Sequence, residues 1–202
     1  MPWDLAAYVA GFGLSFSLIL AIGSQNAFVL KQGLKNQYVF LVCTICAISD
    51  AFLIGVGVAG FGAIVAQFPQ IEVFARYFGA LFLTGYGLLS LRSAFTTQHA
   101  LTAEGESTQS VLKIVLLCLA FTWLNPHVYL DTIMLIGSIS TQYQPHQWSF
   151  WLGAMNASLV FFFGLGFGAR YLSPLFAKPQ AWQILECVVG GVMLVIAYSL
   201  IT

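Results

Sequence analysis

Residues Thr122 to Thr132 read Thr-Trp-Leu-Asn-Pro-His-Val-Tyr-Leu-Asp-Thr, a polar run inside a stretch that is otherwise apolar enough to cross a membrane. Pro126 lies in the middle of that stretch, whereas the other prolines fall at or near positions where the hydrophobic pattern stops. Because proline has no N–H, the carbonyl four residues before it loses its helical donor where bulk water cannot replace it. With Asn125, His127 and Asp131 alongside, the run predicts a helix break and a polar site within the bilayer.

The composition is that of an integral membrane protein. Hydrophobic residues make up 59% of the chain and charged residues only 7%, with a mean hydropathy of +0.88, whereas soluble domains carry about 25% charged residues. Apolar stretches near the ~20 residues of a helical span cover residues 5–30, 37–66, 72–95, 111–136, 148–170 and 182–201. We therefore expect an all-α membrane protein with six transmembrane helices in one domain over residues 1–202. The first stretch exceeds a signal-peptide core and has no basic residue before it, so we expect it to be retained.

The polar segment 96–110 divides these stretches into two sets of three, and we expect it to be a cytoplasmic connector. An odd number of spans inserts a duplicated half upside down relative to its partner, as in many secondary transporters. The run Gln25 to Val29 can be aligned with Leu124 to Val128, and each interrupts the first stretch of its half. The sequence therefore predicts two inverted three-helix repeats, over residues 1–95 and 111–202.

The charges are few and unevenly placed. Seven basic and seven acidic residues give no net charge, which offers no basic surface for nucleic acid. The basic residues that flank the loops after the first, third and fifth stretches are Lys31, Lys35, Arg92, Lys113, Arg170 and Lys178. By the positive-inside rule, those loops face the cytoplasm and both termini lie outside.

Two acids lie inside apolar stretches, Asp50 in the second and Asp131 in the fourth. Each, if ionised against lipid, costs about 2.5–3.5 kcal/mol or more, so both are expected to face the bundle interior. One interpretation is structural, with each acid paired to a basic residue or a hydroxyl. The other is a site for a cation or a proton, which is favoured because no Lys or Arg lies deep within a stretch to neutralise the acids.

The polar neighbours of these acids have two interpretations each. His127 and Asp131 are four residues apart, so they share a helix face and could relay a proton, although a lone membrane histidine is more often a hydrogen-bonded structural residue. Gln25 and Asn26 are typical interhelical hydrogen-bond partners. Their position beside Gly23 and Ser24 also favours a locally unwound segment.

The cysteines indicate packing more than chemistry. Cys43 and Cys46 form a C-x-x-C pattern, but both lie within an apolar stretch, so a transmembrane thiol redox relay is the weaker interpretation. Cys118 and Cys187 have no symmetric mate, and no cluster has metal-ligand spacing. No phosphate-binding or catalytic motif is present. We therefore expect no metal, no cofactor and no enzymatic activity.

Three motifs, in order along the chain, resemble the bacterial lysine and arginine exporter (LysE) family. They are Gly23-Ser24-Gln25-Asn26-Ala27-Phe28-Val29 with the following Lys31-Gln32-Gly33, then Ile48-Ser49-Asp50, then Thr122 to Thr132. The resemblance covers essentially the whole chain, and the Asn-Pro-His-Val-Tyr-Leu-Asp string is most similar to the arginine-exporting branch. One departure is Ser24, because the family usually has proline at that position.

The resemblance implies export of L-arginine, L-lysine or close analogues across the bacterial inner membrane, driven by protons or the membrane potential. Moving a monocation out of a negative interior costs about 2.3 kcal/mol per 100 mV, whereas exchange for an incoming proton is electroneutral. Burial favours the neutral form of a carboxyl group, so substrate and proton could compete for Asp50 and Asp131. Carbonyls freed near Thr122 would face an ammonium, and N–H groups after Pro126 would face the substrate carboxylate.

Two further expectations concern the surroundings of the helices. Small residues at helix-contact spacing, Gly11 with Ser15 and Gly164 with Gly168 among them, indicate close packing rather than a substrate role. The glycine-rich second and fifth stretches could support a homodimer in the lipid bilayer. An uncoupled channel for small solutes or cations remains an alternative function, which interior carboxylates would also suit.

Overall fold

The computed structural model describes residues 3–20, 23–61, 69–96, 110–172, 174 and 179–201, and every element in these ranges is helical. The elements are α1 (Leu5–Ile19), α2 (Ser24–Lys35), α3 (Val39–Val56), η1 (Gly57–Phe61), α5 (Pro69–Thr96), α6 (Val111–Trp123), α7 (Pro126–Tyr129), η2 (Leu130–Ile136), α8 (Gly137–Ser140), η3 (Thr141–Tyr143), α9 (Gln147–Gly168), η4 (Ala169–Leu172) and α10 (Pro179–Ile201). Of the predicted connector, residues 97–109 lie outside the described ranges.

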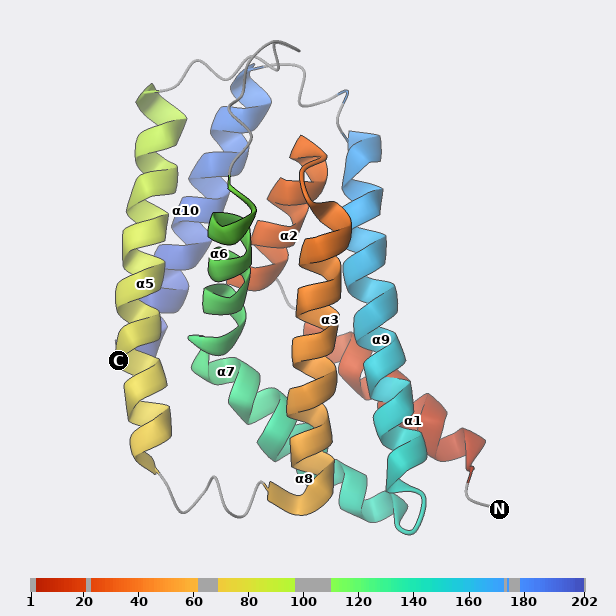
Figure 1. Cartoon of the computed structure of the whole chain (residues 1–202). Helices are drawn as coiled ribbons and strands as arrows, with labels where there is room; N and C mark the ends of the chain where they lie inside the picture. Colours follow the sequence, from red (N-terminus) through yellow and green to blue (C-terminus); the bar gives the residue numbers. More distant parts are fainter. Residues whose placement is uncertain are drawn as a thin grey trace.

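The helices form an elongated bundle whose long members run along one axis (Figure 1). Four described helices are long and apolar enough to cross a membrane, and the number rises to six if each of two bent helix pairs counts as one span. Those pairs are α1 with α2, and α6 with the segment from α7 to η3. The prediction of an all-α membrane fold is confirmed, and the predicted six spans require that both bent pairs cross.

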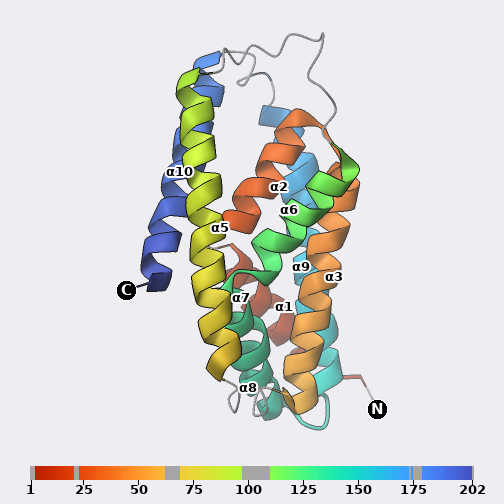
Figure 2. The ribbon, with the colours of Figure 1, turned by 60° about the vertical axis from the view of Figure 1, so that its left-hand side comes forward.

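The third helix of each predicted half packs against its counterpart, α5 against α10, and the second helices α3 and α9 lie side by side. Figure 2 shows the α5–α10 pair standing along one flank of the bundle, with α3 and α9 on the other side. Between these two flanks lie α2, α6 and α7 (Figures 1 and 2). The buried faces of these helices are therefore directed toward the centre of the bundle.

Glycine allows a close helix contact between α1 and α9. A Cβ added at Gly11 would lie 2.0 Å from the carbonyl oxygen of Phe150, and one at Gly153 would lie 2.0 Å from that of Tyr8. The predicted packing role of Gly11 is therefore confirmed. Gly164 and Gly168 show no such packing among the described residues, because a Cβ at either would meet none of their atoms within 4 Å.

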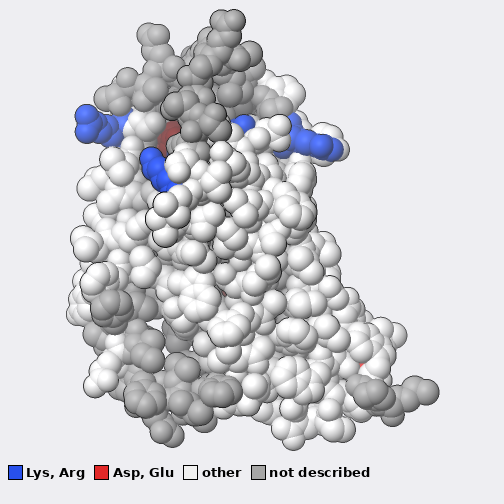
Figure 3. All heavy atoms as spheres, in the orientation of Figure 1, with Lys and Arg blue, Asp and Glu red and all other residues white. Residues whose placement is uncertain are grey.

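The described Lys and Arg side chains gather near one end of the molecule, and a broad uncharged surface extends below them (Figure 3). The start of α1 and the end of α10 lie toward the opposite end (Figure 1). Lys178 lies outside the described residues. A cytoplasmic orientation of the basic end stays a prediction of the positive-inside rule.

Candidate functional site

Two helix breaks face each other in the bundle. The first separates α1 from α2, whose axes differ by 82°, and the second separates α6 from the segment that begins with α7, where the angle is 60°. Gly23 precedes α2 in an extended conformation, and Pro126 is the first residue of α7. Each break interrupts the first membrane stretch of its half of the chain.

The second break is closed by its own polar groups. Asn125 precedes α7 and its side-chain oxygen accepts the N–H of His127 at 3.2 Å, while its carbonyl oxygen accepts the N–H of Val128, also at 3.2 Å. At the first helical position the missing N–H of Pro126 costs no hydrogen bond. The expectation that N–H groups after Pro126 are free for a substrate carboxylate is therefore wrong for these two residues, because Asn125 occupies both.

The carbonyl side of this break is also partly satisfied. The hydroxyl of Tyr129 donates to the carbonyl oxygen of Trp123, the last residue of α6, at 2.6 Å. In the turn before it, the Thr122 hydroxyl donates to the Cys118 carbonyl oxygen at 3.0 Å. The Tyr129 side chain therefore supplies one donor that the broken helix lacks in a low-dielectric interior.

The first break forms although Ser24 stands where the family usually has proline. Helix α1 ends at Ile19, and Asn26 of α2 reaches back so that its side-chain amide donates to the Ile19 carbonyl oxygen at 2.7 Å. Gly23 offers no side-chain cap to the start of α2. The first turn of α2 is thus held by a side-chain bridge to α1 rather than by a cap.

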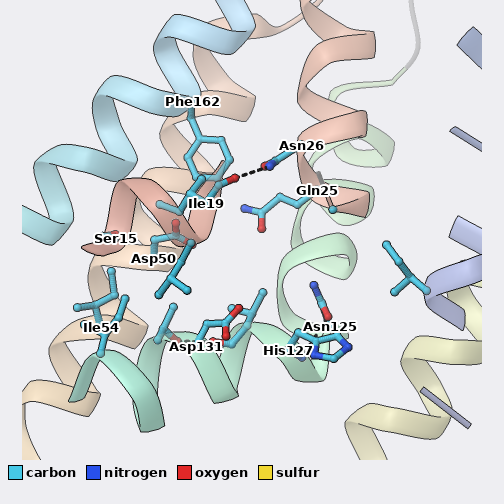
Figure 4. A pocket seen from close by; sticks show the side chains of 16 residues that line it. Ser15, Ile19, Gln25, Asn26, Asp50, Ile54, Asn125, His127, Asp131 and Phe162 are labelled. Carbon is cyan, nitrogen blue, oxygen red and sulfur yellow. Dashed lines mark hydrogen bonds between the residues drawn. The ribbon is translucent and has the colours of Figure 1, made fainter. Parts of the chain in front are cut away.

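A cavity of about 290 Å³ lies between the two breaks (Figure 4). Its lining includes Gly23 and all six residues that the sequence predicts to bind substrate or protons: Gln25, Asn26, Asp50, Asn125, His127 and Asp131. Ser24 and Pro126 lie at the breaks themselves and are not among the lining residues. The structure therefore brings together side chains from α2, α3, α7, η2 and the α6–α7 turn.

Asp50 lies deep in this arrangement, with only 5% of its surface exposed. Its carboxylate accepts a 2.6 Å hydrogen bond from the hydroxyl of Ser158 on α9. Among the described residues no Lys or Arg lies within ion-pair distance of it. Of the structural partners considered, a basic residue or a hydroxyl, Asp50 therefore has only the hydroxyl. Its negative charge has no fixed counter-ion among the described residues.

Asp131 is half-buried and lies in η2, a π-helical segment. Such wide turns are frequent at functional sites, and the sequence, which we interpreted as α-helical, did not reveal this one. The side chain of Asp131 makes neither a hydrogen bond nor an ion pair within the described residues, so no hydrogen bond joins it to His127. His127 and Asp131 therefore both line the cavity, but they lack the direct hydrogen bond that the predicted proton relay would use.

Two further polar groups face the cavity without partners. The side-chain nitrogen of Gln25 and the hydroxyl oxygen of Ser15 are buried, and neither makes a hydrogen bond within the described part of the chain. The sequence spacing predicts Ser15 as a helix-packing residue and does not single out Ser158. No local signal marks either residue, because single serines are common in apolar helices.

A second polar cluster lies away from the cavity, between α2, α5 and α10. Lys31 forms an ion pair with Glu186 at 2.6 Å, with side-chain exposures of 14% and 3%. The Lys31 ammonium also lies 5.7 Å from the centre of the Tyr86 ring. The sequence predicts that Lys31 flanks a loop. In the structure α2 continues to Lys35, so Lys31 lies within a helix of the bundle. The signal missed was Glu186, an acid inside an apolar stretch.

The cysteine thiols make packing contacts between helices. Cys43 donates to the carbonyl oxygen of Phe162 at 3.1 Å, and the Cys46 sulfur lies 3.5 Å from that of Cys118 on α6. All three are buried free thiols. Because the two members of the C-x-x-C pattern contact different helices, the geometry favours the packing interpretation over a redox pair.

The chain is similar to known transport proteins. The family described as LysE type translocator matches residues 16–202. The arginine exporter protein ArgO of Serratia proteamaculans is 42% identical over 198 residues, which are 97% of this chain and 96% of the relative. A Mycobacterium bovis protein named as a candidate amino-acid transporter is 43% identical over 181 residues, 90% of each chain. No solved structure matches. The chain therefore belongs to the LysE translocator family, as its motifs predict, and is a membrane transport protein rather than an enzyme.

Proposed function

We propose that this protein exports arginine and related basic amino acids across the bacterial inner membrane in exchange for protons. The observation that carries the proposal is the cavity between the two helix breaks, which holds two carboxylates without a fixed cationic partner among the described residues. The similarity to ArgO proteins supports arginine as the substrate. The volume of about 290 Å³ is close to the lower end of the range for small-ligand sites, about 300–1,000 Å³.

The two acids differ in their surroundings, which supports different tasks. Asp50 is nearly inaccessible and hydrogen-bonded to Ser158. Asp131 is half-buried in η2, four residues after the exposed His127. A buried carboxylate is unfavourable unless a proton or a cation neutralises it. Binding of a guanidinium or ammonium group at these acids would therefore displace a proton, and the empty site would take one up again.

Exchange with protons answers the energetic problem of exporting a cation. Outward movement of one positive charge opposes the membrane potential by about 2.3 kcal/mol per 100 mV. An inward proton for each outward arginine removes that cost, and the pH gradient then contributes to the driving force. The same pair of carboxylates would serve both cations in turn.

The arrangement of helices supports the predicted inverted repeats. Helix α3 runs in the opposite direction to α9, α5 runs opposite to α10, and the broken pair α1–α2 runs opposite to α6–α7 (Figure 1). Inverted repeats commonly move against each other around a site at broken helices. We propose the same alternating access here; a homodimer stays a prediction.

Coupling is tested in proteoliposomes that contain equal arginine concentrations on both sides. With the membrane potential held at zero by potassium and valinomycin, an imposed acidic interior is expected to drive arginine inward above the external concentration. The driving force is the outward movement of protons in exchange. Radiolabelled arginine inside the vesicles is the measured quantity.

Empty liposomes and vesicles without a pH gradient are the controls. Arginine that only equilibrates, at a rate insensitive to the gradient, would contradict coupled exchange and favour the channel alternative. The redox alternative predicts that replacing all four cysteines with alanine abolishes activity. We expect uphill transport to persist in that variant, because the thiols only pack between helices.

A further inference from the structure

An amino-acid substrate carries a carboxylate as well as its cationic groups, and this negative charge also needs a partner. The described lining of the cavity contains two acids and no Lys or Arg. A carboxylate brought next to Asp50 or Asp131 would be repelled, and transfer from water without hydrogen bonds is costly. The site must therefore hold donors of another kind at some distance from the acids.

The start of α2 provides backbone donors. This helix has 12 residues, and Gly23 before it supplies no side-chain cap. Within the described part of the chain, the backbone N–H groups of Ser24 and Gln25 have no hydrogen-bond acceptor. The N-terminus of a helix carries roughly half a positive charge from its aligned peptide dipoles and commonly binds carboxylates. The start of α7 lacks this property, because Asn125 occupies its first N–H groups.

An independent observation comes from the side chain of Gln25. Gln25 is 7% exposed and lines the cavity, and its amide nitrogen is a buried donor without an acceptor in the described residues. The neighbour of this nitrogen is the Cys46 thiol, whose sulfur is only a weak hydrogen-bond acceptor. Figure 4 shows the Gln25 side chain extending from the start of α2 into the cavity. A buried amide donor left without an acceptor is unfavourable unless a ligand supplies one.

We propose that the α-carboxylate of the substrate binds at the first turn of α2, where it accepts hydrogen bonds from backbone N–H groups and from the side-chain amide of Gln25. This inference rests on the proposed function, because it concerns the same cavity. The carboxylate subsite and the two acids then hold opposite ends of one substrate. Gln25 is a specificity residue, since it distinguishes an amino acid from an amine that lacks the carboxylate.

The test compares arginine with agmatine, its decarboxylated analogue, in binding to the purified protein. We expect Gln25→Met, which keeps the side-chain length but has no amide, to raise the Kd for arginine by about 10- to 100-fold, the usual effect of a hydrogen bond to a charged group. The Kd for agmatine is expected to change by less than about twofold, because its recognition does not use this donor. Binding of radiolabelled arginine, with agmatine as competitor, measures both.

Gln32→Met is the matched control. Gln32 lies on the same helix and is equally buried, but it does not line the cavity, so both Kd values should remain those of the wild type. A Gln25→Met variant that binds arginine as well as the wild type, or that weakens arginine and agmatine equally, would overturn the carboxylate subsite. Failure of the proton exchange would look different. The wild type would then show no pH-driven uptake, while Gln25→Met would still change the ratio of the Kd values for arginine and agmatine.

Discussion

Replacing Asp50 with asparagine is expected to lower arginine export by about 100-fold or more. Truncating one member of a buried charged pair costs about 2–5 kcal/mol, and every 1.4 kcal/mol corresponds to about a tenfold change. Asparagine keeps the volume of the side chain, and its oxygen can still accept the hydrogen bond from Ser158. The loss should therefore fall on transport rather than on folding. The initial rate of arginine efflux from cells loaded with arginine-containing dipeptides is the measurement.

Asp131→Asn should show a similar loss, because the same substrate cation needs both carboxylates in the cavity. Asp4→Asn is the matched control, since Asp4 caps α1 outside the cavity through a hydrogen bond to the Ala7 N–H and asparagine caps helices as well as aspartate. Its export rate should equal that of the wild type. Wild-type rates in Asp50→Asn and Asp131→Asn, with membrane insertion verified, would contradict the role of the two acids.

The largest expected effect on stability comes from the second polar cluster. Glu186→Gln removes the charge that compensates Lys31, and breaking a buried ion pair by removing one partner costs about 3–5 kcal/mol. Glu186 is the more deeply buried member, with its side chain 3% exposed, and Lys31 is held between helices at 14% exposure. We therefore expect a lower free energy of unfolding, measured by denaturant titration of the purified protein in detergent.

The double variant Lys31→Met with Glu186→Gln separates the pair from the packing around it. Removing both charges leaves no uncompensated ion, so stability should return toward the wild-type value. Lys113→Met is a control, because Lys113 is exposed at the start of α6. Equal unfolding free energies of Glu186→Gln and the wild type would show that the pair does not stabilise the bundle.

Much of the fold follows from elementary constraints on chains in lipid. Apolar stretches long enough for a bilayer become helices, since hydrocarbon offers no other partner for the backbone. The predicted stretch 72–95 corresponds to α5 (Pro69–Thr96), and 148–170 to α9 with η4. Wide turns were not predictable, because the residues of Leu130–Ile136, which form a π-helix, carry no sequence pattern that separates this form from an α-helix.

The polar lining of the cavity was more predictable than the hydrogen bonds within it. Polar residues within apolar helices turn inward because lipid excludes them, and this argument alone gathers Asp50, Asp131 and Asn125 around one cavity. A single sequence does not indicate which distant residues contact each other, so the hydrogen bond between Ser158 and Asp50 could not be predicted. The N–H groups expected to bind a carboxylate after Pro126 are not free, because Asn125 caps the helix that begins at Pro126.

Proton release on arginine binding tests most directly whether the substrate cation and the proton compete for the same interior carboxylates. Arginine is added to purified protein in a weakly buffered solution, and the pH change is recorded across the pH range in which export is active. We expect wild-type protein to release protons in proportion to the arginine bound. The double variant that combines Asp50→Asn and Asp131→Asn is expected to release none. Arginine binding without proton release, or equal release by the double variant, would contradict exchange at these two acids.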